Sequence, residues 1–274
     1  MQSATSRESY RAVLDRLAAY AAGADASAVV ATGDEILAVA DLLRREPRLR
    51  RALVDPARTG EERAGLLRGL LTGKVSESTE QLVTELVAGR WGSPSELLDA
   101  MERLGAETLL AAAERAGELA EVEDELFRFG HIVDGHPELA IALGDVTVEP
   151  ARRTELVRTL LEGKAKAITI RLAELAVQGF GGRAVSAGLS RLVELAAERR
   201  DRQIAHVTVA APLTEDEERQ LCARLAEMYG REVTVKCTVD PSVLGGMSVL
   251  IGSHLYDGTV RRRLTDTRKA LTGR

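Results

Sequence analysis

The feature that most constrains this chain is an internal repeat between residues 47–74 and 137–164, which lie ninety positions apart. The two segments align without a gap. Twelve of their 28 positions are identical, whereas the Leu-, Ala- and Arg-rich composition would give about three by chance. The chain therefore holds two copies of one structural unit. The identical positions of the first copy are Pro47, Leu49, Ala52, Leu53, Asp55, Arg63, Leu66, Arg68, Leu70, Leu71, Gly73 and Lys74.

Each copy has the apolar periodicity of amphipathic helices. In the first copy Tyr10, Val13 and Leu17 recur at the spacing of one helix face. A second helix is expected to begin at Asp34 as its N-cap and to stop before Pro47. Further helices are expected around 66–71, over 79–91 and over 94–104, each with a counterpart in the second copy.

Helices of this kind bury their apolar faces by packing into bundles of about 100 residues. We therefore predict two tandem helical bundles, residues 1–105 and residues 106–201. The polar residues near Gly105 and Asp201 predict flexible junctions between the units.

From residue 202 the sequence pattern changes. Segments rich in β-branched residues, at 203–212, 231–242 and 247–258, predict β-strands. Between the first two lies a helix with a capping box, Thr214 and Glu217, and with Gly230 after its last residue. A terminal helix is expected over 259–273. Residues 202–274 thus predict a small β-α-β-β-α domain, and the fold class is mostly α with a C-terminal α+β unit.

Composition excludes several classes of protein. The net charge is −5, so the chain has no global attraction for nucleic acid, although arginines cluster at 199–202 and 261–263. No apolar run reaches the ~20 residues of a membrane span, and the first ten residues lack the apolar core of a signal peptide. Two cysteines provide neither a disulfide framework nor a metal quartet. We expect no cofactor, no metal and no direct membrane insertion.

The glycine-rich stretch from residue 240 to 264 could be mistaken for a phosphate-binding loop. A phosphate loop needs the pattern G-x-x-x-x-G-K-[ST] between a strand and a helix, and that pattern is absent from the sequence. Every glycine has a backbone role in turns between strands instead. The residues assigned to structural turns are Asp240, Gly245, Gly246, Gly252, Asp257 and Gly258.

No catalytic constellation stands out elsewhere. The four histidines form no H-x-x-x-H pair, and neither a G-x-S-x-G elbow nor a favoured carboxylate pair is present. Apolar helix faces that could accept an amphipathic partner helix remain. The same apolar residues could equally fill the core of each bundle.

The C-terminal motifs carry a family resemblance. Ala211-Pro212-Leu213, then Val239-Asp240 with Gly245-Gly246, then Asp257-Gly258-Thr259-Val260 follow one another in the order typical of the F-type ATP synthase delta subunit family. The mitochondrial member of that family is the oligomycin-sensitivity-conferring protein. The second helical copy is similar to the family's six-helix N-terminal domain, and the first copy matches the family's long form.

The resemblance implies a non-catalytic stator subunit at the cytoplasmic face of the plasma membrane. Such a subunit caps the (αβ)3 catalytic head formed by alpha and beta subunits, and holds N-terminal segments of alpha subunits. Its C-terminal domain binds the b subunit of the peripheral stalk, so that rotor torque drives ATP synthesis. It binds no nucleic acid.

By the same resemblance, alpha-subunit segments would bind between the first and fifth helices of a copy. The residues expected to line these sites are Val13, Leu17, Leu82 and Leu86 in the first copy, and Leu109, Leu110, Leu172 and Leu175 in the second. The alternatives are a helical adaptor scaffold of another multisubunit complex, a nucleic-acid-binding protein and an enzyme.

Overall fold

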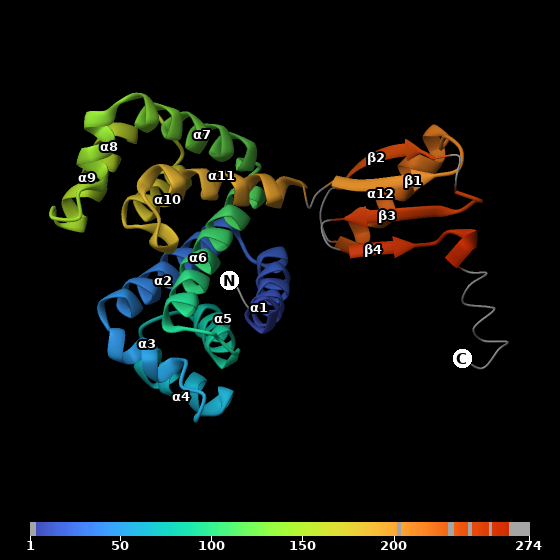
Figure 1. Cartoon of the computed structure of the whole chain (residues 1–274). Helices are drawn as coiled ribbons and strands as arrows, with labels where there is room; N and C mark the ends of the chain where they lie inside the picture. Colours follow the sequence, from blue (N-terminus) through green and yellow to red (C-terminus); the bar gives the residue numbers. More distant parts are fainter. Residues whose placement is uncertain (1–3, 202–203, 230–232, 241–242, 252–253, 263–274) are drawn as a thin grey trace. The chain divides into compact units, whose positions relative to one another are not determined.

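The computed structural model describes residues 4–201, 204–229, 233–240, 243–251 and 254–262 of the 274-residue chain. It divides into two compact units, Met1–Ala196 and Ala197–Arg274 (Figure 1). The described part of the first unit is helical, and the second is built on a four-stranded sheet. The predicted fold class, mostly α with a C-terminal α+β unit, is confirmed.

The helices of the first unit follow the duplicated sequence, so that the set α2–α5 has its counterpart in α7–α10. They are α1 (Ala4–Gly23), α2 (Ala26–Arg45), α3 (Pro47–Leu53), α4 (Gly60–Leu71), α5 (Glu77–Ala88), α6 (Pro94–Arg115), α7 (Leu119–Gly135), α8 (Pro137–Gly144), α9 (Pro150–Leu161), α10 (Ala167–Val177), the 3-10 turn η1 (Phe180–Gly182) and α11 (Val185–Asp201), whose last residues belong to the second unit.

Two details of the predicted helices are wrong. The second helix begins at Ala26 after Asp25, and Asp34 lies inside it, where its side chain forms an ion pair with Arg171. The prolines that end α2 and α7 also begin the short helices α3 and α8, because proline at the first helical position lacks only an N–H that would be unpaired there anyway. The periodicity search missed both short helices.

The expected boundary between the bundles, residue 105, lies in the middle of α6. This helix runs unbroken for 22 residues and contributes its first half to the core of copy one and its second half to the core of copy two. Gly105 itself is buried. The flexible junction expected there is therefore absent from the described chain, and residues 1–196 form one unit.

The close approach of α2 to α6 depends on two glycines. A Cβ atom at Gly33 would lie 2.8 Å from Leu109 Cδ2, and one at Gly105 would lie 2.5 Å from Leu37 Cδ2. Each glycine thus receives a leucine of the opposite helix directly on its backbone. The pairs run in opposite directions along the two helices, so α2 packs antiparallel on α6. The packing joins copy one to copy two.

A buried arginine occupies the same position of each copy. Arg63 of α4 donates hydrogen bonds to the carbonyl oxygens of Ala88 and Gly89 (3.0 and 2.9 Å), which end α5. Arg153 of α9 donates likewise to Val177 O at the end of α10 (2.9 Å). A cation that pairs with C-terminal carbonyls complements the helix dipole. This contact explains why both copies keep the arginine.

A carboxylate acceptor also recurs at the same position of each copy. Glu35 Oε2 of α2 accepts from the Ser76 backbone N–H (2.9 Å), the Ser76 hydroxyl (2.6 Å) and the Thr79 hydroxyl (2.5 Å) at the start of α5. Glu125 accepts from the N–H of Lys166 (2.9 Å) and the Thr169 hydroxyl (2.5 Å) at the start of α10. In each copy, the second helix thereby fixes the N-terminus of the fifth.

The second unit contains β1 (Ile204–Val209), α12 (Glu215–Tyr229), β2 (Thr234–Val239), β3 (Met247–Ile251) and β4 (His254–Asp257). The strand order is β2-β1-β3-β4, with β1 and β2 parallel and the other pairs antiparallel. The third predicted strand is thus a hairpin of two. The capping box is confirmed, because the Thr214 hydroxyl accepts from the Glu217 N–H and Glu217 accepts from the Thr214 N–H.

Gly230, expected after the last residue of α12, lies outside the described residues. So does most of the predicted terminal helix, of which residues 260–262 are described and are helical.

The glycine contacts predict opposite effects for two substitutions. Gly105→Val forces Leu37 out of its site and lowers the free energy of unfolding by about 1–3 kcal/mol, as expected of overpacking. Gly65→Ala in α4 meets open space and should raise that free energy by up to ~1 kcal/mol through helix propensity. Urea unfolding followed by circular dichroism measures both. Equal effects of the two changes would contradict the close α2–α6 packing.

The Glu35 contact predicts a pH dependence. Burial by itself would raise the pKa of this carboxyl, but the hydrogen bonds from Ser76 and Thr79 outweigh burial and hold the pKa below its ordinary 4.5. The lowered pKa means that the stabilising contribution is present above pH 4.5 and is lost as the pH falls through the folded-state value. The stability difference between the wild type and Glu35→Gln should therefore be constant from pH 7 to 5 and shrink below. A difference that grows on acidification would contradict this reading.

Candidate partner-binding surfaces

The structure places the four residues predicted to line the site of copy one in its core. Val13 and Leu17 of α1 and Leu82 and Leu86 of α5 belong to one buried cluster, and each is at most 1% exposed. The structure brings them together as predicted but does not expose them. They are the contact by which α1 packs on α5.

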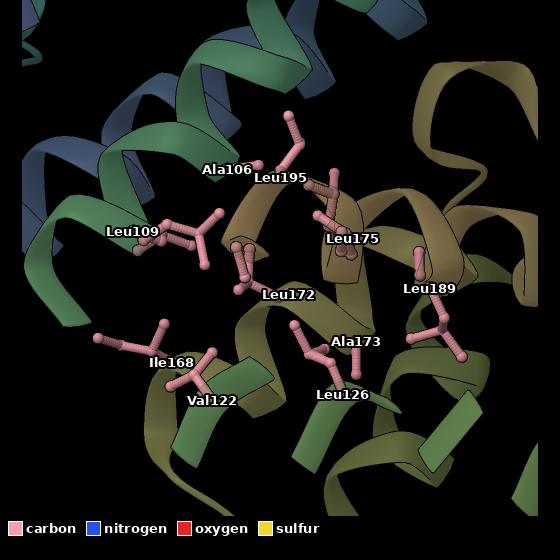
Figure 2. Close-up of a cluster of buried hydrophobic side chains, with 14 of the residues drawn as sticks. Ala106, Leu109, Val122, Leu126, Ile168, Leu172, Ala173, Leu175, Leu189 and Leu195 are labelled. Carbon is pink, nitrogen blue, oxygen red and sulfur yellow. The ribbon is translucent and has the colours of Figure 1, made fainter. Parts of the chain in front are cut away.

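The four residues of copy two are buried as well. Leu109 and Leu110 of α6 and Leu172 and Leu175 of α10 are at most 4% exposed and share a cluster with α7 and α11. Figure 2 shows the α6, α7 and α10 side chains of this cluster directed into a common interior. The physical reason is the same in both copies, since apolar residues on facing helices bury each other first.

In copy two the seam between the first and fifth helices, α6 and α10, is also covered from outside. Val29 of α2 belongs to the buried cluster of copy two, and Val30 and Leu37 pack against it. Asp34 of α2 accepts twice from Arg171 Nε of α10, at 2.9 and 3.0 Å. Copy one therefore supplies the helix that lies on this seam.

In copy one the equivalent seam, between α1 and α5, is polar. Arg16 of α1 forms an ion pair with Glu85 of α5, where copy two has Ala106 and Leu175 ninety positions on. The outward residue Ala19 similarly replaces Leu109. The outer side of this seam is therefore not an apolar groove for a partner helix.

A groove of about 730 Å³, lined by both charged and apolar residues, lies where α2 meets α9 and α10. Most of its charged residues pair within the chain: Arg44 donates to Gln178 (3.1 Å) and to Glu102 (2.8 Å), and Arg158 pairs with Glu174. The lining residues are Asp34, Leu37, Ala38, Asp41, Arg44, Arg45, Glu149, Pro150, Ala151, Thr154, Arg171, Glu174, Leu175 and Gln178. Such internal pairing holds the helices around the groove together.

Glu102 is the most buried of these acids, with 2% of its side chain exposed. Burial raises its pKa, against the lowering effects of the Gly181 N–H (2.7 Å) and of Arg44. The carboxyl thus ties α2, α6 and η1 together. Sequence reasoning missed it because nothing in its neighbours along the chain indicates burial.

A second groove, the α7–α9 groove, is mainly apolar. It has a volume of about 340 Å³. Ile132, on its edge, has 49% of its surface exposed. The lining residues are Glu125, Arg128, Phe129, Ile132, Leu139, Leu160, Leu161, Lys164 and Ala165. Sequence reasoning missed this groove, although the repeated Leu-Leu and Gly-Lys pairs lie at one of its ends.

In the second unit one face of the sheet packs on α12 and the other is open among the described residues. Val207, Val249 and Leu225 form part of the core on the covered face. On the opposite face Leu250 of β3 and Leu255 of β4 are directly paired and are 40% and 63% exposed. The open face of the sheet thus presents two adjacent exposed apolar side chains.

The glycines of the predicted turns have backbone roles. Gly245 and Gly246 have φ angles of +136° and +80°, which side chains disfavour. A Cβ atom at Gly246 would lie 2.5 Å from the carbonyl oxygen of Gly258, so this turn also needs close backbone approach. Gly252 lies outside the described residues.

The two aspartates of these turns form hydrogen bonds within the chain. Asp257 Oδ1 accepts from the Thr259 hydroxyl (2.7 Å) and N–H (3.0 Å), and these bonds lower its pKa. The Asp240 N–H donates to Val209 O (2.9 Å), which fixes the end of β2 beside β1. Both aspartates shape turns of the chain.

Across the described ranges, no three histidine, cysteine or acidic side chains gather as metal ligands would. Nor does any described helix combine the length and apolarity needed to cross a bilayer. The described residues thus combine buried apolar contacts, mostly paired charges and two exposed apolar surfaces, features common in proteins that bind other chains.

Comparison with known proteins identifies the family. Residues 101–271 match the model of the family described as ATP synthase delta (OSCP) subunit. The chain is 63% identical to ATP synthase subunit delta of Salinispora arenicola and 60% identical to that of Salinispora tropica, in both cases over 100% of both chains. It is 45% identical to the Streptomyces avermitilis subunit, over 97% of each chain. The chain therefore belongs to the ATP synthase delta (OSCP) subunit family, and it is a non-catalytic stator subunit.

The family model and the relatives match different lengths of the duplicated chain. The family model begins at residue 101, inside α6, and so covers copy two and the second unit, whereas the relatives also match copy one. A chain in the cryo-EM structure of the Toxoplasma gondii mitochondrial ATP synthase hexamer matches 62% of this chain and 97% of its own length. The sequence identity of this match is 17%, and its TM-score is 0.35.

The Glu102 contacts predict unequal effects at two arginines. Arg44→Ala leaves a buried carboxylate without its cation and should lower the free energy of unfolding by about 2–3 kcal/mol at pH 7. Arg171→Ala breaks a half-exposed pair and should cost at most ~1 kcal/mol.

The Arg44→Ala loss should also shrink as the pH falls toward 4. In this variant the pKa of Glu102 is raised further, so protonation relieves the penalty on the acid side. Chemical denaturation at several pH values measures both variants. A pH-independent loss would mean that Arg44 acts through packing alone.

Proposed function

We propose that this chain joins the (αβ)3 catalytic head of ATP synthase to the b subunit of the peripheral stalk. The helical unit binds N-terminal segments of alpha subunits at the head, and the second unit binds b. The observation that carries the proposal is the full-length match to proteins named ATP synthase subunit delta. The two exposed apolar surfaces, one in each unit, support a bridging role.

A stator connection must hold against a torque that returns with every rotation. Several modest contacts on one chain suit this demand, because after the first contact forms the others are held at high local concentration. The shared α6 helix supports the proposal, since a head-binding unit built as one body does not yield between its two copies.

We also place the protein at the cytoplasmic face of the plasma membrane, as a peripheral part of the assembled complex. The delta-family membership supports this location.

The eight leucine and valine positions enter this proposal indirectly. Their burial makes them the walls that hold the first and fifth helices together, so a partner segment would meet the outer faces of those helices or a neighbouring groove. Charged substitutions at the eight positions would damage the fold before they could report on binding.

The b contact is tested on the open face of the sheet. Leu250→Asp combined with Leu255→Asp should weaken binding of the full-length chain to the soluble part of b by about tenfold or more, because the change places two charges in an apolar interface. Met228→Asp on α12, which is 60% exposed, is the control and should leave binding unchanged.

Binding is measured by surface plasmon resonance, with the head interaction measured in parallel. Unchanged b binding by the double variant would remove the sheet face from the proposal. Failure of the wild type to bind either b or the head would remove the proposed function itself.

A further inference from the structure

The α7–α9 groove combines an apolar floor with exposed apolar edges. Ile132 is 49% exposed, and Leu139 and Leu160 are only partly buried. Ile132 lies beside further apolar side chains of the groove, and contiguous exposed apolar surface of this kind marks interaction sites.

The duplication gives an internal control for this groove. At every lining position except Arg128, which is Ala38 in copy one, the two copies carry the same residue or another apolar one. Ile132 corresponds to Leu42 and Leu160 to Leu70, and both copy-one residues are exposed as well. Gly163-Lys164 and Gly73-Lys74 end the groove identically.

The seam between the first and fifth helices does not show the same agreement between the copies. There Arg16 faces Glu85, whereas copy two has Ala106 and Leu175. The two copies thus differ at the seam between the first and fifth helices. At the α7–α9 groove and its equivalent in copy one, both copies keep leucine or isoleucine. Retention of exposed apolar residues in both copies points to binding.

The rim of the groove carries two exposed cations, Lys164 and Arg128. Lys164 Nζ donates one hydrogen bond to Leu160 O (3.1 Å) and forms no ion pair among the described residues. Arg128 is 73% exposed, and its ion-pair partner among the described residues is the half-exposed Asp124 of its own helix. Glu125, the acid of the lining, is engaged by Lys166 N–H and Thr169. A ligand with carboxylates beside an apolar stripe therefore complements the groove.

We propose that the α7–α9 groove seats an acidic amphipathic helix contributed by the catalytic head. Its apolar stripe packs on Ile132, Leu139 and Leu160, and its carboxylates lie at Lys164 and Arg128. The inference rests on the proposed function, which places the helical unit on the head. It assigns the contact to the second and fourth helices of a copy, away from the covered seam.

The test compares two equally exposed positions of α7 in the full-length chain. Ile132→Glu should weaken binding to the purified (αβ)3 head by about tenfold or more, since it puts a charge on the apolar edge of the groove. Phe127→Glu changes a residue that is 52% exposed on the same helix but outside the groove, and should leave the affinity within about twofold.

A second variant, Lys164→Glu, should weaken binding about threefold or more at low salt, with a smaller effect at high salt. Circular dichroism and thermal melting of each variant establish that the fold is intact.

The outcomes distinguish failure of the groove assignment from failure of the proposed function. Loss with Ile132→Glu and not with Phe127→Glu supports the groove. If the wild type binds the head and Ile132→Glu binds equally well, or if both variants lose affinity equally, the groove assignment is overturned while the proposed function stands. No binding of the wild type to the head overturns the proposed function and the groove with it. Self-association of the wild type that Ile132→Glu abolishes would assign the groove to a second copy of the chain and overturn the inference.

Discussion

The close packing of α2 on α6 is the constraint on which the rest of the helical unit depends. Two backbone positions without side chains, Gly33 and Gly105, each admit a leucine of the opposite helix. Because α2 belongs to copy one and α6 belongs to both copies, this contact turns two repeats into one body. It also covers the α6–α10 seam of copy two, so the same packing decides which surfaces remain free for partners.

The two copies show which contacts a six-helix unit needs and which it can change. Arg63 and Arg153 both hold the end of the fifth helix, and Glu35 and Glu125 both hold its start. These groups are buried or engaged in several hydrogen bonds, so their loss would leave unpaired polar atoms. The residues at the outer side of the seam between the first and fifth helices do not have this role, and they differ between the two copies. A duplicated stator subunit can thus keep its helix framework and give its copies different surfaces.

The candidate site was only partly accessible to sequence reasoning. The family resemblance paired Val13 with Leu82 and Leu109 with Leu172 on the first and fifth helices, and each pair shares a buried cluster. Periodicity shows that these residues lie on apolar faces, but it cannot tell an inward face from a groove. Glu102 and the covering role of α2 depend on contacts between residues of different copies. The α7–α9 groove could have been suspected from the repeat, because Leu160, Leu161 and Lys164 all have identical counterparts ninety positions earlier.

The amino-acid sequence by itself determined the duplication, the helical character of residues 4–201, the change to a sheet near residue 204, the capping box at Thr214 and the delta-family motifs. All of these rest on local spacing, which propensity and periodicity express directly. Only the tertiary structure decided that α6 is one helix shared by both copies, that α3 and α8 exist, and that the predicted binding leucines are interior. Those outcomes depend on which apolar faces find each other in space, and that choice is made by packing between residues far apart in the chain.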